Sequence, residues 1–109
     1  MKKIYYIYIL LCENNCYYTG YTTDLPKRYQ AHQDGRAAKY TRAFPPKQLV
    51  AAWQINGSLS AALKIEAFLK KHSRAQKQLW VAEPNSFIKI LTTLDIVDIV
   101  CLNPSAMNL

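Results

Sequence analysis

One set of residues combines side chains that can move protons with side chains that can hold a charged ligand. It consists of two phenols, a glycine, a guanidinium, an imidazole and a carboxylate, in Tyr8, Tyr18, Gly20, Arg28, His32 and Glu66. Cleaving a phosphodiester bond needs a group that takes a proton from water, a cation that steadies the phosphate charge, and a carboxylate that can hold a divalent metal. A glycine on a strand also lets a phosphate approach the backbone closely. The set therefore matches hydrolysis of phosphodiester bonds.

Each member of this set also has an ordinary structural explanation. The tyrosines are compatible with half-buried strand positions, and His32 with the border of a buried helix face. Glu66 stands four residues before Lys70, so the two can form a weak ion pair on a helix. The chemistry therefore depends on the residues being brought together by the fold.

The two tyrosines are expected on one β-hairpin. Residues 3–12 are rich in Ile, Leu and Tyr and predict a strand, residues 13–15 a turn, and residues 16–22 a second strand. A three-residue loop pairs Tyr8 with Gly20. Because side chains alternate along a strand, one face should carry Tyr6, Tyr8, Tyr18 and Gly20.

The next element is a short helix that positions a cation and an imidazole. Asp24 is a suitable N-cap, and Gly35 is a natural residue just past the C-terminus. The helix between them places Arg28 and His32 one turn apart, at the border of its apolar face. These two side chains are therefore predicted to be neighbours at the border of the buried face of the helix.

The remaining pattern predicts an α+β fold, a small three-stranded antiparallel sheet flanked by helices. The expected elements are a basic loop at 36–47, a strand at 49–55, helices at about 58–72, 73–82 and 86–94, and an apolar segment at 96–102. Glu66 falls on the inward side of the helix at 58–72. We predict a domain over residues 1–82 and an extension over 83–109 that packs on the domain or at an interface, including that of a homodimer.

The charge is strongly basic and uneven. Lys and Arg number 14 against 7 Asp and Glu, and residues 1–82 alone carry 13 basic and 4 acidic side chains. A basic region of this kind favours a polyanionic partner, and nucleic acid is the first candidate. Charge alone does not distinguish DNA from RNA. The residues predicted to contact the nucleic acid, besides Gly20, are Lys39, Tyr40, Arg42, Lys70, Lys71, Arg74 and Lys77. Tyr40 and Phe44 are candidates to stack on an exposed base.

The same sequence excludes several other classes of protein. It has no apolar run of about 18 residues, so no transmembrane helix is predicted. The apolar stretch after the N-terminus lacks the small-residue site at which a signal peptide is cut. Three scattered cysteines suit a reducing compartment, and the predicted location is the cytoplasm.

The spacing of these residues resembles that of the GIY-YIG endonuclease family, in particular its small single-domain bacterial branch. The two signature tripeptides correspond to Tyr6-Ile7-Tyr8 and Tyr18-Thr19-Gly20, with nine residues between Tyr8 and Tyr18, and Arg28 follows ten residues later. Glu66 lies on a later helix, as the family's glutamate does, and the stretch Ala38-Lys39-Tyr40-Thr41-Arg42 is similar to one in the small bacterial members. The resemblance covers residues 3 to about 82. Tyr6 stands where the family name has glycine, and Tyr21 where some repair-type members have lysine.

The resemblance implies roles for the individual residues. Tyr8 would be the general base or help to activate the attacking water, and Tyr18 would polarise the phosphate site or share the proton relay. Arg28 would stabilise the scissile phosphate, Glu66 would hold one Mg²⁺ or Mn²⁺, and His32 would tune the proton of Tyr8. The implied activity is metal-dependent endonucleolytic cleavage of DNA, branched or damaged DNA included, of the repair or recombination type.

Two alternatives to the nuclease are kept. One is a non-catalytic nucleic-acid-binding module that retains the fold, but binding alone does not need an inward-facing glutamate at Glu66. The other is an interaction protein whose apolar segment 96–102 docks a partner or forms a dimer. We expect this segment instead to fold back on its own domain.

Overall fold

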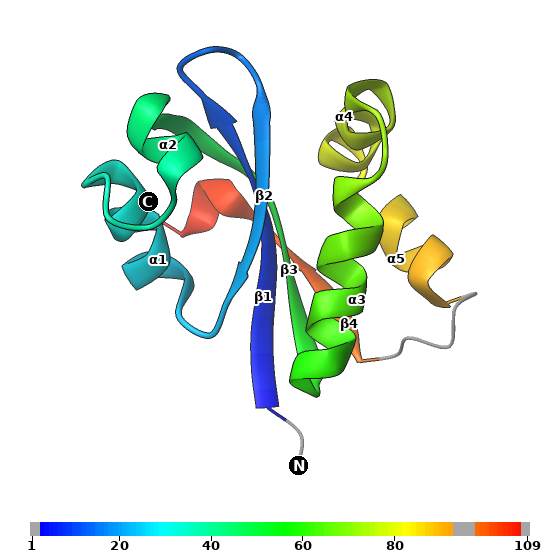
Figure 1. The fold of residues 1–109 in the computed structure, drawn as a ribbon. Helices are drawn as coiled ribbons and strands as arrows, with labels where there is room; N and C mark the ends of the chain where they lie inside the picture. The colour runs from blue at the N-terminus through cyan, green and yellow to red at the C-terminus, as the bar shows by residue number, and fades with distance from the viewer. Residues whose placement is uncertain (1–2, 93–97, 108–109) are drawn as a thin grey trace.

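The protein folds around a four-stranded antiparallel sheet with the strand order β2-β1-β3-β4 (Figure 1). The computed structural model describes residues 3–92 and 98–107. The strands are β1 (Lys3–Cys12), β2 (Tyr17–Thr22), β3 (Pro46–Gly57) and β4 (Ile99–Leu102). The helices are α1 (Leu25–Gln33), α2 (Lys39–Ala43), α3 (Leu59–Lys70), α4 (Arg74–Ala82), α5 (Pro84–Thr92) and the 3-10 turn η1 (Pro104–Ala106). The predicted α+β class is confirmed, and the sheet has one strand more than the three predicted.

The β1–β2 hairpin has the predicted register. Tyr8 pairs with Gly20 across the hairpin. At the turn, the amide of Cys12 donates a hydrogen bond to the Cys16 carbonyl over 2.9 Å. Asn15 adopts a φ of 64°, a left-handed conformation that asparagine tolerates in turns. The three-residue loop therefore sets which side chains of β2 lie beside those of β1.

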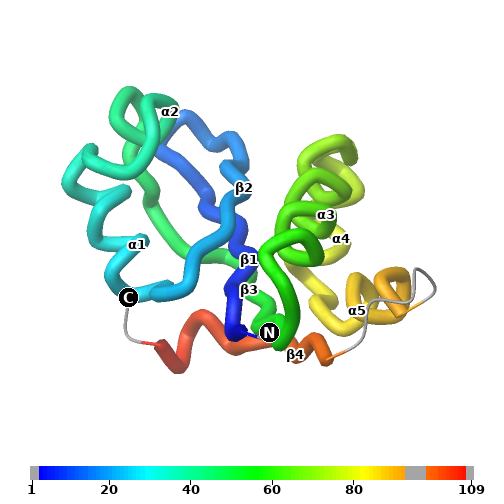
Figure 2. Tube along the Cα trace, turned by 60° about the horizontal axis from the view of Figure 1, so that its bottom comes forward, coloured from blue at the N-terminus to red at the C-terminus, as the bar shows by residue number. Residues whose placement is uncertain are grey.

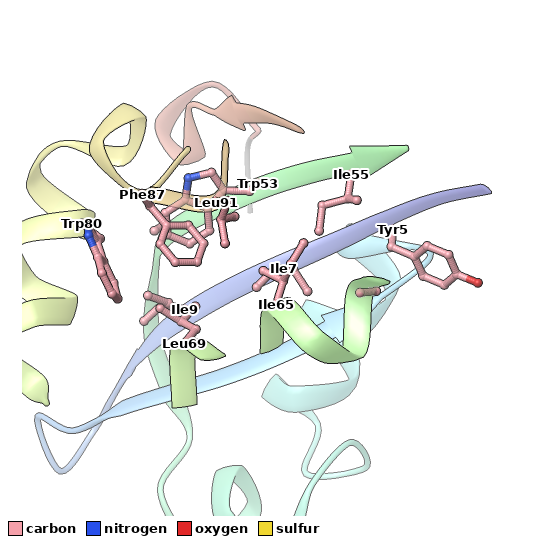
Figure 3. Packing of buried hydrophobic residues seen from close by; sticks show 12 residues of the cluster. Tyr5, Ile7, Ile9, Trp53, Ile55, Ile65, Leu69, Trp80, Phe87 and Leu91 are labelled. Atoms are coloured by element: carbon pink, nitrogen blue, oxygen red, sulfur yellow. The ribbon is translucent and has the colours of Figure 1, made fainter. Parts of the chain in front are cut away.

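Helices cover both faces of the sheet (Figures 1 and 2). On one face, helices α3, α4 and α5 cover the larger hydrophobic core, whose packing is shown in Figure 3. On the other face, α1 and α2 lie over a smaller core that includes Tyr8, Leu25 and Tyr29. Because successive strand residues point to opposite faces, Tyr8 belongs to the smaller core and its neighbours Ile7 and Ile9 to the larger one.

The sequence patterns predicted for the two ends of the first helix are confirmed. Asp24 caps α1 by accepting a hydrogen bond from the Lys27 amide, and Gly35 follows α1 with a φ of +74°. Ser58 and Ser73 cap α3 and α4 in the same way. Helix α2 was predicted as part of a loop, because five residues are too few to show a helical period.

The C-terminal region packs on the rest of the domain. Phe87 and Leu91 of α5 are fully buried in the larger core, and the indole Nε1 of Trp53 donates a hydrogen bond to the Pro84 carbonyl over 3.0 Å. Helix α5 begins at Pro84 rather than at the predicted residue 86, since proline is accommodated in the first helical turn.

The described part of the segment predicted at 96–102 folds back on its own domain, as expected. It forms β4, which pairs antiparallel with β3 at the sheet edge. Ile96 and Val97 lie outside the described residues, as do positions 93–94 of the helix predicted at 86–94. Within residues 3–92 and 98–107, no helix has the length and apolar character needed to span a bilayer.

Candidate active site

A buried chain of hydrogen bonds links β1, α1 and α2 at the centre of the candidate site. The Tyr8 hydroxyl lies 2.7 Å from Nε2 of His32, and Nδ1 of His32 lies 2.7 Å from Oγ1 of Thr41. The Thr41 hydroxyl donates its own proton to the carbonyl of Ala38 over 3.3 Å. All three side chains that form the chain are buried, with the imidazole of His32 completely enclosed.

The direction of this chain follows from the single proton of the Thr41 hydroxyl. Because that proton goes to Ala38, the Thr41 oxygen accepts from Nδ1–H of His32. Nε2 of a neutral imidazole is then an acceptor, and the Tyr8 phenol donates to it. We infer from this arrangement that His32 is the tautomer that accepts a hydrogen bond from Tyr8.

Burial keeps both partners of this hydrogen bond neutral. Desolvation, with a further contribution from the nearby Arg28 charge, lowers the pKa of His32 to about 4. Desolvation also raises the pKa of Tyr8 to about 12, against the opposing effect of the Arg28 guanidinium beside its hydroxyl. Near neutral pH, His32 is therefore unprotonated and Tyr8 is a phenol.

Gly20 provides the space that the Tyr8 side chain occupies. A Cβ atom at position 20 would lie 2.5 Å from the Tyr8 hydroxyl oxygen and 2.7 Å from Cζ of the same ring. Such contacts are too short for any side chain, so the glycine is required for the Tyr8 ring to lie over β2. The ring of Tyr8 fills the side of the backbone on which a Cβ atom of residue 20 would lie. The predicted approach of a phosphate to Gly20 stays a prediction.

Arg28 projects from α1 with part of its guanidinium unsatisfied. Its Nη2 donates to the Ala37 carbonyl over 3.3 Å, whereas its Nε is buried and has no hydrogen-bond partner among the described residues. A buried N–H without a partner costs free energy unless a ligand supplies an acceptor. A phosphate oxygen is the kind of acceptor that a guanidinium binds best.

Glu66 lies on α3, on the other side of the sheet, and is close enough for its charge to act on the Tyr8 hydroxyl. Its side chain is 15% exposed, and its carboxylate lies 3.6 Å from Nζ of Lys70. The negative charge of Glu66 contributes to the raised pKa of Tyr8. The predicted residues Tyr8, Arg28, His32 and Glu66 are therefore brought together from three elements that are separate in the sequence.

Glu66 fits a divalent cation in one particular way. Over the described part of the chain, no group of three or more His, Cys, Asp or Glu side chains is placed to hold a metal ion. Mg²⁺ is commonly held by one or two carboxylates, with waters and substrate phosphate oxygens completing the octahedron. A single partly buried carboxylate suits a cation of this kind that is shared with a phosphate ligand.

Tyr18 connects the buried network with a surface groove. Its ring meets that of His32 edge-on, with centroids 5.2 Å apart, and stacks on that of Tyr40 at 5.9 Å. The groove has a volume of about 240 Å³. It is lined by Tyr17, Tyr18, Thr19, Tyr40, Lys70 and Lys77. Three of the residues predicted to bind nucleic acid, Tyr40, Lys70 and Lys77, therefore meet here.

The other predicted cations do not line this groove. Lys39 and Arg42 are exposed on α2, and Lys71 lies over the ring of Phe68 with Nζ 5.3 Å from its centroid. The guanidinium of Arg74 donates to the Asn15 carbonyl and lies over the ring of Tyr17, 4.6 Å from its centroid. Contacts of these four side chains with a nucleic acid stay predictions.

Sequence reasoning missed the contribution of Thr41. The residue lies in the stretch 38–42, which resembles one in the small bacterial GIY-YIG proteins, so the sequence does contain a signal for it. A threonine in a predicted loop gives no indication of its partner, however, and the short helix α2 that turns its hydroxyl toward His32 was not predicted.

Comparison with known proteins agrees with this geometry. Residues 4–79 match the family described as the GIY-YIG catalytic domain. This match spans well over half of the chain, and it includes Tyr8, Arg28, His32 and Glu66. The chain belongs to the GIY-YIG family.

Within this family the chain is similar to small bacterial UPF0213 proteins. It is 44% identical to one from Xanthomonas axonopodis pv. citri, over 77% of this chain and 82% of the relative. It is 37% identical to the UPF0213 protein YazA of Bacillus subtilis, over 72% and 79% of the two chains. The solution NMR structure of the UPF0213 protein BH0048 from Bacillus halodurans is 42% identical, with coverage of 72% of this chain and 83% of that chain and a TM-score of 0.47.

Proposed function

We propose that the protein is a divalent-metal-dependent endonuclease that hydrolyses phosphodiester bonds in DNA, with selectivity for branched, flapped or damaged structures of the kind handled in repair or recombination. The observation that carries the proposal is the directed chain from Tyr8 through His32 to Thr41, beside the unpartnered guanidinium nitrogen of Arg28. The membership in the GIY-YIG family supports a nucleic-acid substrate.

The proposed chemistry begins with the phenol of Tyr8. As Tyr8 takes a proton from the attacking water, it passes its own proton to the unprotonated Nε2 of His32, so that no free phenolate has to accumulate. The water oxygen bonds to phosphorus, the bond from phosphorus to the leaving sugar oxygen breaks, and that oxygen takes up a proton from solvent. The transfer from Tyr8 to His32 is unfavourable in the free protein, because the pKa of Tyr8 is about 12 and that of His32 is about 4. A bound phosphate would offset the charge of Arg28, which is one cause of the low pKa of His32, and would thereby favour the transfer.

Two further groups act on the phosphate in this proposal. Arg28 binds a non-bridging oxygen through its unpartnered Nε and stabilises the charge that develops there. Glu66 is the residue that would hold Mg²⁺ or Mn²⁺, which supplies Lewis-acid stabilisation of the phosphoryl oxygens when bound. With one protein carboxylate available, we expect the cation to bind far more tightly together with DNA than alone.

A non-catalytic nucleic-acid-binding module is the second candidate. It would explain the basic groove, but it assigns no role to the buried Tyr8 hydroxyl that donates to the unprotonated His32. The hydrogen-bond chain therefore favours the nuclease.

The test is a cleavage assay on labelled substrates of defined structure. The full chain is incubated with single-stranded, duplex, flapped and branched DNA, and with RNA of the same sequence, in Mg²⁺, Mn²⁺ or EDTA. Tyr8→Phe and Glu66→Gln are expected to lose at least about 100-fold in rate, the lower end of what a general base contributes. The matched controls are Tyr6→Phe, on the same face of β1, and Glu83→Gln at the exposed end of α4; both should retain activity.

The controls separate the outcomes. Cleavage that survives Glu66→Gln would indicate a contaminating nuclease or a wrong site. Salt-sensitive binding without cleavage of any substrate would favour the binding module instead. Preference for flapped or branched DNA over duplex supports the structural selectivity, and equal cleavage of all forms contradicts it.

A further inference from the structure

The groove beside the active site crosses the edge of the sheet and is built from both helical layers. Strand β2 contributes its floor, α2 contributes Tyr40 on one side, and α3 and α4 contribute Lys70 and Lys77 on the other. At one end it reaches Tyr18, which touches His32, and Lys70, which pairs with Glu66. Any ligand in the groove is therefore adjacent to the candidate catalytic residues.

Among the described residues, one buried polar group of the groove has no partner, and two ammonium groups line the same groove, of which Lys70 pairs with Glu66. The Thr19 side chain is 4% exposed, and its hydroxyl oxygen is buried without a hydrogen-bond partner in the part of the chain that the structure describes. Burial and the nearby charge of Lys70 lower the pKa of Lys77. A buried hydroxyl and two neighbouring ammonium groups together favour an anion with several acceptor oxygens, such as a phosphate.

The aromatic groups of the groove continue outward as a row of rings. Tyr18 stacks on Tyr40 with an interplanar angle of 21°, and Tyr40 in turn meets Phe44 with centroids 5.5 Å apart. Tyr40 is 37% exposed and Phe44 is 41% exposed, whereas large aromatic side chains are usually more buried. The ring of Tyr40 is held in place, because its hydroxyl accepts a hydrogen bond from Nδ2 of Asn14 over 2.8 Å.

We infer that this groove binds one unpaired nucleotide of the DNA strand next to the scissile phosphate, its base stacked on Tyr40 and Phe44 and its phosphate held by Thr19, Lys70 and Lys77. A base inside a continuous duplex is stacked on its neighbours and is not available to these rings, so the substrate class is DNA with unpaired bases at the cleavage site. The inference rests on the proposed function, because it places the bound strand relative to the catalytic residues.

The first experiment measures binding and needs no cleavage. Fluorescence anisotropy in EDTA and at one fixed salt concentration compares a short single strand with the duplex of the same sequence. Tyr40→Ala should weaken single-strand binding about tenfold, toward the lower end of what one base–aromatic stack contributes, and should change duplex binding less than twofold. Tyr40→Phe, which keeps the ring, is the matched control and should bind like the wild type.

A second experiment starts from the wild-type protein, so its main result does not depend on a variant being folded. A single abasic site is moved along the strand, and one position should weaken binding about as much as Tyr40→Ala does. With Tyr40→Ala, the same abasic site should have no additional effect. The base analogue 2-aminopurine at that position should lose fluorescence on binding, as a stacked base does.

The outcomes separate this inference from the proposed function. Tyr40-dependent binding of single strands without cleavage would support the nucleotide site and refute the nuclease. Cleavage of duplex and single strands at equal rates, unchanged by Tyr40→Ala, would leave the nuclease standing and overturn the nucleotide site. An abasic scan without a sensitive position would overturn it as well.

Discussion

Replacing Thr41 with valine tests the reasoning about the hydrogen-bond chain most directly. Valine is close to threonine in shape but has no hydroxyl, so Nδ1–H of His32 loses its acceptor in a completely buried position. Leaving such a donor unsatisfied costs about 1–3 kcal/mol. Because this cost applies only to the tautomer that accepts from Tyr8, the other tautomer becomes competitive.

The magnitude of the effect on catalysis follows from that cost. A penalty of 1–3 kcal/mol lowers the ratio of the accepting tautomer to the other tautomer by roughly 5- to 150-fold. We therefore expect kcat to fall by about tenfold to a hundredfold, with KM nearly unchanged, because Thr41 lies behind His32 and not in the groove. Thr41→Ser retains the oxygen and should keep kcat within a few-fold of the wild type.

The assay combines cleavage kinetics with nitrogen chemical shifts of the imidazole, which report the tautomer directly. In the wild type, Nδ1 of His32 should carry the proton; in Thr41→Val, part of the signal should move to the Nε2-protonated form. A folded valine variant with wild-type kcat would refute the assignment. Equal losses for valine and serine, in parallel with lower thermal stability, would show a purely structural role for Thr41.

Three further predictions concern the same network and the core around it. The pKa of His32 is about 4 in the folded protein and 6.5 in the unfolded chain, so the unfolded chain binds more protons between these two pH values. The free energy of unfolding should therefore fall by on the order of 3 kcal/mol from pH 6.5 to pH 4. Denaturant titrations should show a smaller fall for His32→Gln. Gly20→Ala should destabilise the protein by about 1–3 kcal/mol and abolish cleavage, since its Cβ would lie 2.5 Å from the Tyr8 hydroxyl; Gly57→Ala, whose Cβ would meet nothing closer than 3.7 Å, should do neither. Phe87→Ala should cost about 3–5 kcal/mol in the same titrations, and a loss below about 1 kcal/mol would contradict a core role for α5.

The parts of the fold that local sequence rules determine were predictable. The register of the hairpin follows from the length of its turn, and the ends of α1 follow from Asp24 and Gly35. The alternation of side chains then places Tyr8 on one face of the sheet without further information. These features depend on residues that are close in sequence, so the pattern alone contains them.

The parts that depend on long-range packing were not predictable in the same way. Helix α2 is only five residues long, and the hydroxyl it supplies to His32 is visible only once α1 and α2 are packed together. Strand β4 pairs with β3 across more than 40 residues of intervening chain; the sequence favoured packing of this segment on its own domain over an interface, but it did not identify β3 as the partner strand. Burial, which sets the protonation states of Tyr8 and His32, is likewise a property of the assembled layers.

The position of β2 at the sheet edge explains how one site draws on both layers. A central strand would separate its two faces completely, but at an edge the side chains from the two sides can meet around the backbone. The β1–β2 turn that ends this edge is held from both layers: Asn14 donates to Tyr40 of α2, and the Asn15 carbonyl accepts from Arg74 of α4. Arg74 therefore has a structural contact that a nucleic acid would have to displace. We conclude that the turn fixes the spacing between Tyr40 and Lys77, and that the width of the groove depends on it.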